Sequence, residues 1–491
     1  MKSPGRNRVR KYHHIAHVLN DVTPHIIRWC TPSIDPGSKK VLAPYLSDIS
    51  VSYQSLGIPS IPSGIFAKAH AKAAKAYGSD RTLFSVNGST GSNFVVLRAL
   101  SRQIPFIKVL AMRNIHKSVL FASEDYSINL MFLPPKIDQE LQLFLPNTVG
   151  EIVDCVKKAS PDVLLLTNPS YEGLTLNLKK LIKILRKKFP NLIIFVEEAW
   201  GSHLHFSDKL PISAMSAGAD ICIQSTHKQG GALQQAAMIH WKNARINSDV
   251  LIDSYKSITT SSPSFLLLAS LDSARHLMEK YGKSKINKLL YIAAQLEKGL
   301  NTVPGFNVVA LAELKNKHIS VFDQDKTKII VNISGTGMTG YQIAKILEEE
   351  FMIIVEKSSE SSLLFLVPLQ AQIKNVRETI KALKIIVKRY RKNHQNISRL
   401  SLMIPQNIIK MREISEIVKL RLDQIEKIHL EKAVGRIAAE NISIYPPGIP
   451  ITIKGEEFTQ ETIDYYLRCR DHNNCTILAQ DQSLKTVAVV K

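Results

Sequence analysis

Cysteine is scarce in this chain, and no stretch is long and apolar enough to suggest a membrane span. The 491 residues include five cysteines, which are odd in number, scattered and without the spacing of a metal site (positions 30, 155, 222, 469 and 475). This pattern excludes a disulfide framework and indicates reduced thiols. The N-terminus also lacks the apolar segment of a signal peptide. We therefore expect a cytoplasmic protein without a membrane segment or a bound metal.

Acidic residues are also few. The chain has 42 aspartates and glutamates against 64 lysines and arginines, which gives a net charge of +22. Such an excess can indicate nucleic-acid binding. Most of the basic residues are spread along amphipathic segments such as 178–188, and a local cluster near the N-terminus belongs to a predicted terminal arm (Arg6, Arg8, Arg10 and Lys11). Because no nucleic-acid-binding motif accompanies the charge, a nucleic-acid partner is not expected.

The most informative stretch runs from Ala219 to Gly231. A short apolar strand (Ile221 to Gln224) is followed by Ser225, Thr226, His227 and Lys228, and then by two glycines. Burial removes water from a lysine amine and lowers its pKa, which makes the amine a nucleophile. Such an amine forms a Schiff base with an aldehyde. The neighbouring side chains offer hydrogen-bond donors to a phosphate, so the stretch indicates pyridoxal phosphate, an aldehyde with a phosphate arm.

Pyridoxal phosphate also needs a carboxylate beside its ring nitrogen. The apolar strand at 191–196 ends in Glu197 and Glu198, and ligands lie at the carboxyl ends of strands in a parallel α/β sheet. Side chains alternate along a strand, so Glu198 is expected to point away from the face that carries Glu197. Glu197 is therefore the predicted ring-nitrogen partner, and its charge would raise the pKa of that nitrogen.

These stretches resemble the Orn/Lys/Arg decarboxylases, which are pyridoxal-phosphate enzymes of the aspartate aminotransferase fold. The matching residues are Gln224 to Lys228, Gln235 to His240 and Glu197 to Trp200. One residue departs from the family pattern, because Glu197 stands where the family has aspartate. The resemblance is to the short type, which lacks an N-terminal receiver-like wing, and the family's N-terminal motifs are eroded in 31–39 and 57–64.

Two further segments match the family. A strand at 82–86, a turn at 87–93 and a helix from Phe94 to Leu100 form a strand–turn–helix unit whose free backbone N–H groups suit an anion. The resemblance assigns the phosphate to Ser89, Thr90 and Gly91 of this turn. In the segment 113–118, it places His116 flat on the cofactor ring. The loop 260–265 resembles one that carries Ser262 to the phosphate of a neighbouring subunit, which implies a homodimer or a higher homo-oligomer.

The chain is too long for one ordinary domain. Strands that alternate with helices predict an α/β fold with a mostly parallel sheet. We expect an N-terminal arm at 1–60, a cofactor-binding large domain of fold type I at 61–304, a small α/β domain at 305–395 and a C-terminal domain at 396–491. The last assignment rests on the resemblance of 431–440 and 444–456 to the C-terminal domain of the decarboxylases.

The resemblance implies decarboxylation of arginine, lysine or ornithine to a polyamine-type amine. Lys228 would hold the cofactor, and Lys228 or His227 would donate the proton that replaces the carboxylate. Glu456 and Tyr445 are the predicted substrate-binding residues, and the alternative for Glu456 is a solvated surface acid. Two other functions stay open: transaminase-like or oxidative chemistry on the same scaffold, and a non-catalytic relative. The intact Lys228 argues against the last of these.

Overall fold

The computed structural model describes residues 27–29, 58, 63–390, 413–445, 449–471 and 476–491. The basic cluster from Arg6 to Lys11, the segment 31–39, Cys30, Cys475 and residues 446–448 lie outside this part of the chain, as does most of 57–64. Among the described helices, none combines the length and the apolar character that crossing a bilayer requires.

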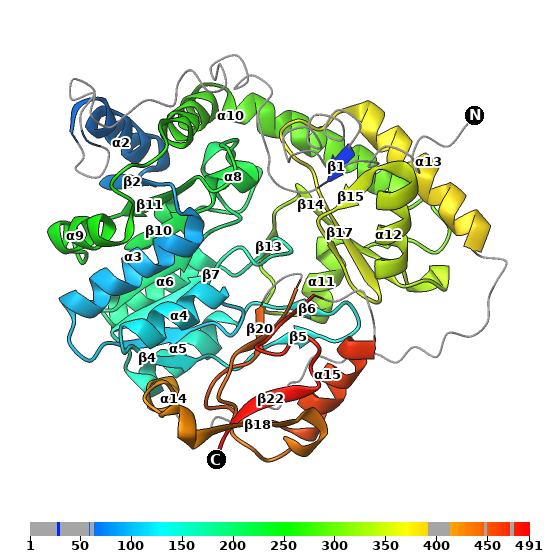
Figure 1. Cartoon of the computed structure of the whole chain (residues 1–491). Coiled ribbons are helices and arrows are strands. Elements are labelled where there is room, and N and C mark those ends of the chain that lie inside the picture. Colours follow the sequence, from blue (N-terminus) through cyan, green and yellow to red (C-terminus); the bar gives the residue numbers. More distant parts are fainter. Residues whose placement is uncertain (1–26, 30–57, 59–62, 391–412, 446–448, 472–475) are drawn as a thin grey trace.

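A seven-stranded sheet organises the first half of the molecule (Figure 1). Its strands follow the order β2-β11-β10-β9-β7-β3-β4, in which β10, β9, β7, β3 and β4 are parallel and β11 is antiparallel to both of its neighbours. The bounds are β2 Arg81–Ser85, β3 Lys108–Ala111, β4 Asn129–Phe132, β7 Val163–Thr167, β9 Ile193–Glu197, β10 Ile221–Gln224 and β11 Ala237–Trp241. The predicted strands at 82–86 and 221–224 are confirmed within a residue.

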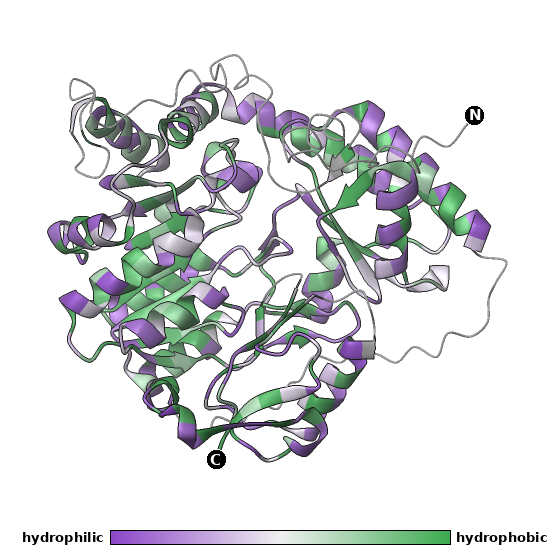
Figure 2. Ribbon diagram, viewed as in Figure 1, coloured by the Kyte–Doolittle hydropathy of each residue, from purple (hydrophilic) through white to green (hydrophobic). Residues whose placement is uncertain are grey.

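Both faces of this sheet are covered, which explains its apolar strands. Ile193 and Phe195 of β9 join the core formed with one set of helices, α3 Gly88–Gln103, α4 Lys117–Asp125 and α9 Ser248–Ile258. Ile194 and Val196 face the other set, α5 Val149–Ala159, α6 Leu178–Lys188 and α7 Ala214–Ala217. Figure 2 shows the hydrophobic residues concentrated on these central strands. The alternation continues to Glu197, which therefore lies on the α3 face.

Two helices flank the sheet and lead out of it. The helix α2 (Gly64–Tyr77) ends at Gly78, which adopts the left-handed conformation, with φ of 70°. A glycine adopts this conformation without the strain that a Cβ would cause. The helix α10 (Phe265–Leu300) runs from the large sheet into the next unit (Figure 1).

The second unit has a four-stranded sheet in the order β12-β14-β17-β16. Its strands are β12 Asn307–Val308, β14 Lys328–Asn332, β16 Lys357–Ser358 and β17 Ser362–Leu366, and its helices are α11 Leu311–Lys317, α12 Gly340–Phe351 and α13 Ile373–Tyr390. A strand from the predicted N-terminal arm, β1 (Ile27–Trp29), pairs with β15 (Ile353–Val355). Trp29 is fully buried, and its Nε1 donates to Oγ1 of Thr379 at 2.7 Å, so this part of the arm belongs to the core of the second unit.

The C-terminal residues form small sheets and helices that pack on the large sheet. The elements are α14 Ile414–Val418, β18 Ile425–His429, β19 Ile442–Tyr445, β20 Ile449–Thr452, α15 Gln460–Asp471, β21 Thr476–Leu478 and β22 Thr486–Val490. β5 (Ile137–Asp138) and β6 (Leu143–Phe144) form a short hairpin, and the pairing of β8 (Leu174–Thr175) with β13 (Asp323–Gln324) joins the first two units. Lys454 also forms an ion pair with Glu124 of α4 at 2.8 Å.

Two element boundaries differ from the prediction at the site. The helix expected from Phe94 begins at Gly88, so Ser89, Thr90 and Gly91 form its first turn instead of the preceding loop. Lys228 lies in a short helix of its own, α8 (Thr226–Gln229), one turn beyond β10. Gly230 permits this turn, because a Cβ there would lie 2.7 Å from the carbonyl oxygen of Thr226 and 3.0 Å from Oγ of Ser202.

Candidate active site

Lys228 stands at the carboxyl ends of the central parallel strands. Its Nζ lies 3.9 Å from the centroid of the Trp200 ring, a cation–π contact. Burial lowers the pKa of Lys228 to about 8, although the negative charges of Glu197 and Glu356 act in the opposite direction. The amine therefore has the property expected of a nucleophilic lysine.

Glu197 is the last residue of β9, and it pairs in register with Ile223 of the neighbouring strand β10. It is 6% exposed, and burial raises the pKa of its carboxyl group, while the charge of Lys228 and the backbone N–H of Ala199 lower it. Glu197 is thus close enough to Lys228 to respond to its charge. A carboxylate in this position suits a positively charged ring nitrogen.

Glu198 lies on the opposite side, as the alternation of the strand predicts. Its carboxylate accepts hydrogen bonds from Nε2 of Gln224 at 2.6 Å and from the backbone N–H of Ala214 at 2.7 Å. Burial raises the pKa of Glu198 to about 8. These contacts give Glu198 a structural role beneath the sheet, which leaves Glu197 as the carboxylate on the Lys228 side.

Polar groups suited to a phosphate gather at the beginning of α3. The hydroxyls of Ser89 and Ser225 are 2.7 Å apart. Asn87 makes no side-chain cap, and the first turn of the helix has no acidic residue, so nothing there opposes an anion. Within the described residues, the buried hydroxyls of Ser202 and Thr226 have no hydrogen-bond partner. Unpaired buried hydroxyls and a helix N-terminus fit the phosphate arm of pyridoxal phosphate.

His116 caps the N-terminus of α4, where its Nδ1 lies 2.8 Å from Oγ of Ser118. The hydroxyl of Ser118 also accepts a hydrogen bond from Nδ2 of Asn93 at 2.9 Å. Burial, and after it the charge of Lys228, lower the pKa of His116 to about 4. The imidazole is therefore neutral near pH 7, which suits a ring that packs against a flat cofactor.

His227 is held by its backbone surroundings. Its Nδ1 is 2.9 Å from the carbonyl oxygen of Ala236, and because a carbonyl only accepts, Nδ1 carries the hydrogen. Burial lowers the pKa of His227 to about 4. A neutral His227 with its proton engaged is a poor proton donor, which favours Lys228 for that step.

Three predicted residues are not brought to Lys228 by the described part of the chain. Ser262 is exposed, with its hydroxyl 3.3 Å from Oγ1 of Thr260. Glu456 is 5% exposed and forms an ion pair with Arg113 at 3.1 Å, so the alternative of a solvated surface acid is wrong. The backbone of Tyr445 ends β19, and its side chain lies outside the described residues.

A buried polar cluster from the second unit completes the site, and the sequence reading missed it. Nε2 of Gln229, next to Lys228, donates to Oγ1 of Thr327 at 2.8 Å. The hydroxyl of Thr327 in turn donates to Oδ1 of Asp325 at 2.8 Å, and Oδ2 of Asp325 lies 3.1 Å from Nε2 of His203. Lys328 follows in the same turn, with its Nζ 3.6 Å from the centroid of the Trp200 ring. The available signal was a lysine at the start of an apolar strand, whereas Lys228 was identified as a lysine that follows one.

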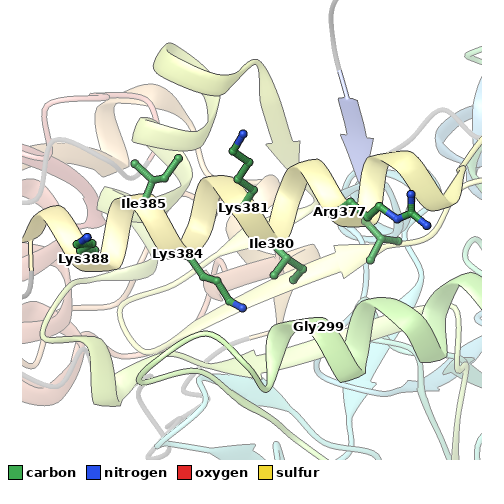
Figure 3. A pocket seen from close by; sticks show the side chains of 8 residues that line it. Gly299, Arg377, Ile380, Lys381, Lys384, Ile385 and Lys388 are labelled. Carbon is green, nitrogen blue, oxygen red and sulfur yellow. The ribbon is translucent and has the colours of Figure 1, made fainter. Parts of the chain in front are cut away.

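A surface hollow of about 560 Å³ lies elsewhere, between α10 and α13 (Figure 3). Its lining consists of Gly299, Val376, Arg377, Ile380, Lys381, Lys384, Ile385 and Lys388. None of these is a predicted site residue. The hollow is therefore separate from the site around Lys228.

The fold is fold type I, the fold of a large group of pyridoxal-phosphate enzymes. The structure is similar to that of the constitutive lysine decarboxylase of E. coli, with a TM-score of 0.75 and 22% identity, over 91% of this chain and 75% of that one. The model of the major domain of the Orn/Lys/Arg decarboxylases matches residues 43–375, and the model of their C-terminal domain matches 403–475. The chain belongs to the Orn/Lys/Arg decarboxylase family.

Curated relatives extend over nearly the whole chain. The arginine decarboxylase of Bacillus subtilis (strain 168) is 33% identical over 439 residues, which cover 88% of this chain and 86% of that protein. The arginine decarboxylase of Halalkalibacterium halodurans is 31% identical over 476 residues, with 93% and 94% coverage. The resemblance inferred from the Lys228 stretch is confirmed.

Proposed function

We propose that this protein is a pyridoxal-phosphate-dependent decarboxylase of a basic amino acid, with arginine as its first candidate substrate. The observation that carries the proposal is the placement of Lys228, with its lowered pKa, beside the buried carboxylate Glu197 at the ends of adjacent strands. Arginine is favoured because the two relatives described above are named arginine decarboxylases. The scattered thiols agree with a cytoplasmic location.

The residues present suit the cofactor in four ways. Lys228 would hold its aldehyde carbon, Glu197 would keep its ring nitrogen protonated, and His116 would pack against its ring. Ser89 and Ser225, with the first turn of α3 (Thr90 and Gly91 among its residues), would bind the phosphate. When bound, pyridoxal phosphate supplies an electron sink for the electron pair that the departing carboxylate leaves behind.

Lys228 is the proposed proton donor to the substrate carbon. When not bonded to the cofactor, its Nζ would carry a proton, and a pKa of about 8 would leave that proton easy to transfer near neutral pH. Trp200 would cover Lys228 and help to exclude water, and the Tyr171 ring supports it edge to face, with centroids 4.8 Å apart.

The substrate's cationic end is assigned to Glu456 and Tyr445, and the phosphate also to Ser262 of a neighbouring subunit. The exposure of Ser262 in the single chain agrees with a partner across a subunit interface. A homodimer is therefore the proposed minimum unit. Sedimentation velocity of the cofactor-loaded protein tests it, and an active monomer would contradict it.

Glu197 favours one second candidate, transaminase-like or oxidative chemistry on the same scaffold. Glutamate is longer than the aspartate of the family by one methylene, which would shift the ring or fold the side chain back. Such a shift changes which bond of the substrate is aligned for cleavage. The two chemistries differ in their products.

Product analysis separates the candidates. The protein is incubated with pyridoxal phosphate and with arginine, lysine or ornithine in turn, and amines, carbon dioxide and keto acids are measured. We expect agmatine and carbon dioxide from arginine, and no product from a Lys228→Ala control. A keto acid, with or without hydrogen peroxide, would favour the second candidate, and no product from any substrate would favour a non-catalytic relative.

A further inference from the structure

His116 receives two hydrogen bonds at one ring nitrogen. Its Nδ1 accepts from the backbone N–H of Ser118 at 3.2 Å, and it lies 2.8 Å from the hydroxyl of the same serine. Because a backbone N–H can only donate, Nδ1 carries no hydrogen. In a neutral imidazole the hydrogen is then on Nε2, which is the ring nitrogen further from the first turn of α4.

Asn93 of α3 sets the direction of the Ser118 hydroxyl. Its Nδ2 donates to Oγ of Ser118 at 2.9 Å, so the hydroxyl would meet a second donor if its own hydrogen turned toward Asn93. That hydrogen points to Nδ1 of His116 instead. Asn93 is fully buried and Ser118 is 1% exposed, so water does not compete for these bonds. The hydrogen bonds therefore run in one direction, from Asn93 to Ser118 and from Ser118 to His116.

The charges around His116 also favour a neutral ring. Burial is the largest cause of its low pKa, followed by the positive charges of Lys228 and Lys117. Asn93, which faces α4 from α3, brings no charge. Three acids near the site act on or pair with other bases: Glu197 acts on Lys228, Glu456 pairs with Arg113, and Glu124 pairs with Lys454. A hydrogen bond donated to the neutral form of a base acts in the same direction as burial.

We propose that Asn93 and Ser118 are positioning residues that hold His116 as a neutral imidazole with its hydrogen on Nε2. The inference rests on the proposed function, in which His116 packs against the cofactor ring and Glu197 keeps the ring nitrogen protonated. A charged His116 flat on that ring would repel its positive charge and lower the pKa of the ring nitrogen, against the effect of Glu197. A neutral imidazole packs there without this repulsion, so the ring remains an electron sink.

Nitrogen NMR of protein labelled at histidine measures the tautomer without turnover, because protonated and unprotonated ring nitrogens resonate far apart. The signals of His116 are identified by their loss in His116→Gln. Titrations are recorded on cofactor-free protein and on protein loaded with pyridoxal phosphate. In the wild type we expect a bare Nδ1, a hydrogen on Nε2 and no protonation of His116 from about pH 8 down to about pH 6, given a pKa of about 4.

Asn93→Asp reverses the direction of the hydrogen bonds. An aspartate carboxylate can only accept, so it takes the hydrogen of Ser118, and Oγ then presents a lone pair to Nδ1 of His116. The added negative charge favours the imidazolium as well. We expect the pKa of His116 to rise by about 1–3 units. In the loaded protein, the acid side of the pH–rate profile should move up with the titration of His116.

The hydroxyl of Ser118 is tested without a new charge. Ser118→Ala removes one of the two donors to Nδ1, so the pKa of His116 should rise by about one unit at most, the effect of one hydrogen bond. Ser118→Thr restores the hydroxyl and should titrate as the wild type. Ser123→Ala is the matched control in the same helix: it removes a buried hydroxyl that donates to the carbonyl oxygen of Val119 at 2.7 Å, and it should leave the titration of His116 unchanged.

The outcomes separate this inference from the proposed function. A wild-type His116 with its hydrogen on Nδ1, or one that titrates near the ordinary pKa of about 6.5, overturns the inference. Variants at Asn93 and Ser118 that melt at a lower temperature but leave the titration in place would show a merely structural role and overturn it too. Should Asn93→Asp fail to fold, the wild type and Ser118→Ala still decide. If pyridoxal phosphate does not load onto Lys228, the proposed function is overturned, whereas the tautomer is judged on the cofactor-free protein alone.

Discussion

At the scale of single residues, the site depends on carboxylates that differ in their surroundings. Glu197 and Glu198 are adjacent in sequence, yet one faces Lys228 and the other accepts hydrogen bonds from Gln224 and Ala214. The alternation of a strand produces this separation. It allows one carboxylate to serve the cofactor while the other fixes the loop beneath the sheet.

Substitution of Glu197 tests its proposed role at the ring nitrogen. Glu197→Gln keeps the shape but removes the charge that holds the nitrogen protonated, so we expect the cofactor to remain bound while kcat falls roughly 100-fold. Glu197→Asp keeps the charge and should remain active. Cofactor absorbance and steady-state kinetics measure the two effects. A Gln variant with the wild-type rate would remove Glu197 from this position.

Substitution of Glu456 tests two competing roles of its carboxylate: the ion pair with Arg113 and the proposed contact with the substrate. Its carboxylate accepts from Arg113 and from the backbone N–H of Ile453 at 2.7 Å, and Arg113 is 3% exposed. Glu456→Gln leaves a buried guanidinium without its counter-charge, so we expect a loss of about 3 kcal/mol in the free energy of unfolding. Urea denaturation measures it.

Kinetics on the same variant address the proposed contact with the substrate. If Glu456 also binds the substrate's cationic end, the KM for arginine rises far more than the dissociation constant of the cofactor. Arg113→Met is the matched control, since it breaks the same ion pair from the other side while it retains the carboxylate. An unchanged KM in Glu456→Gln would remove this residue from the substrate site.

At the scale of elements, one turn of the second unit fixes the helix that carries Lys228. Two hydrogen bonds, from Gln229 to Thr327 and from Thr327 to Asp325, connect the large sheet's unit with the second unit. All three residues are fully buried. Figure 1 shows β13, just before this turn, between the large sheet and β14. The geometry of α8 therefore depends on residues about one hundred positions away in the sequence.

Removal of the Thr327 hydroxyl should loosen this link. Thr327→Val has the same shape but leaves the amide of Gln229 and the carboxylate of Asp325 each without one hydrogen bond, which we expect to cost about 2 kcal/mol in the free energy of unfolding. Thr327→Ser restores the hydroxyl and should recover most of this stability. Chemical denaturation of the two variants provides the comparison, and equal stability of both would contradict the role of the hydroxyl.

The sequence predicts the parts of the site that local patterns encode. Strand periodicity located β9 and β10, and the order of residues after each strand identified Lys228 and Glu197. The contacts of Lys328 with Trp200 and Tyr171 could not be predicted in this way, because these residues meet it only after two units pack together. Glu456 shows the same limit, since Arg113 lies in a different unit and its approach depends on β20.

At the scale of the whole molecule, neutral buried histidines make stability depend on pH. Burial lowers the pKa of four histidines well below 6.5: to about 4 for His70, His116 and His227, and to about 3 for His240. His116 and His227 border the site, and His240 lies between Oγ1 of Thr82 at 2.7 Å and Oε1 of Gln224 at 3.2 Å. A fall in pH therefore affects the protonation of all four histidines over the same range.

The sign of this dependence follows from proton binding in the two states. Between pH 6.5 and about 4 the unfolded chain protonates these histidines while the folded protein does not, so acidification favours unfolding. Their contribution is fully present above pH 6.5 and is lost as the pH falls towards 4. A fall in pKa from 6.5 to about 4 corresponds to about 3 kcal/mol at most for each of His70, His116 and His227. We therefore expect the midpoint of thermal unfolding to fall steeply below pH 6.5.

His70→Asn tests the contribution of one histidine. Nε2 of His70 accepts from the backbone N–H of Phe84 at 3.3 Å, and its ring meets the Phe84 ring edge to face, with centroids 4.7 Å apart. The Asn variant should be less stable than the wild type at pH 8, because these contacts are lost. Between pH 6.5 and 5, however, its free energy of unfolding should fall less than that of the wild type, because one proton fewer is taken up on unfolding. The exposed His276 provides the control as His276→Asn, whose curve should run parallel to the wild type. A His70→Asn curve that also runs parallel to the wild type would show that His70 takes up no proton on unfolding in this range, and the acid sensitivity would then belong to the histidines around Lys228.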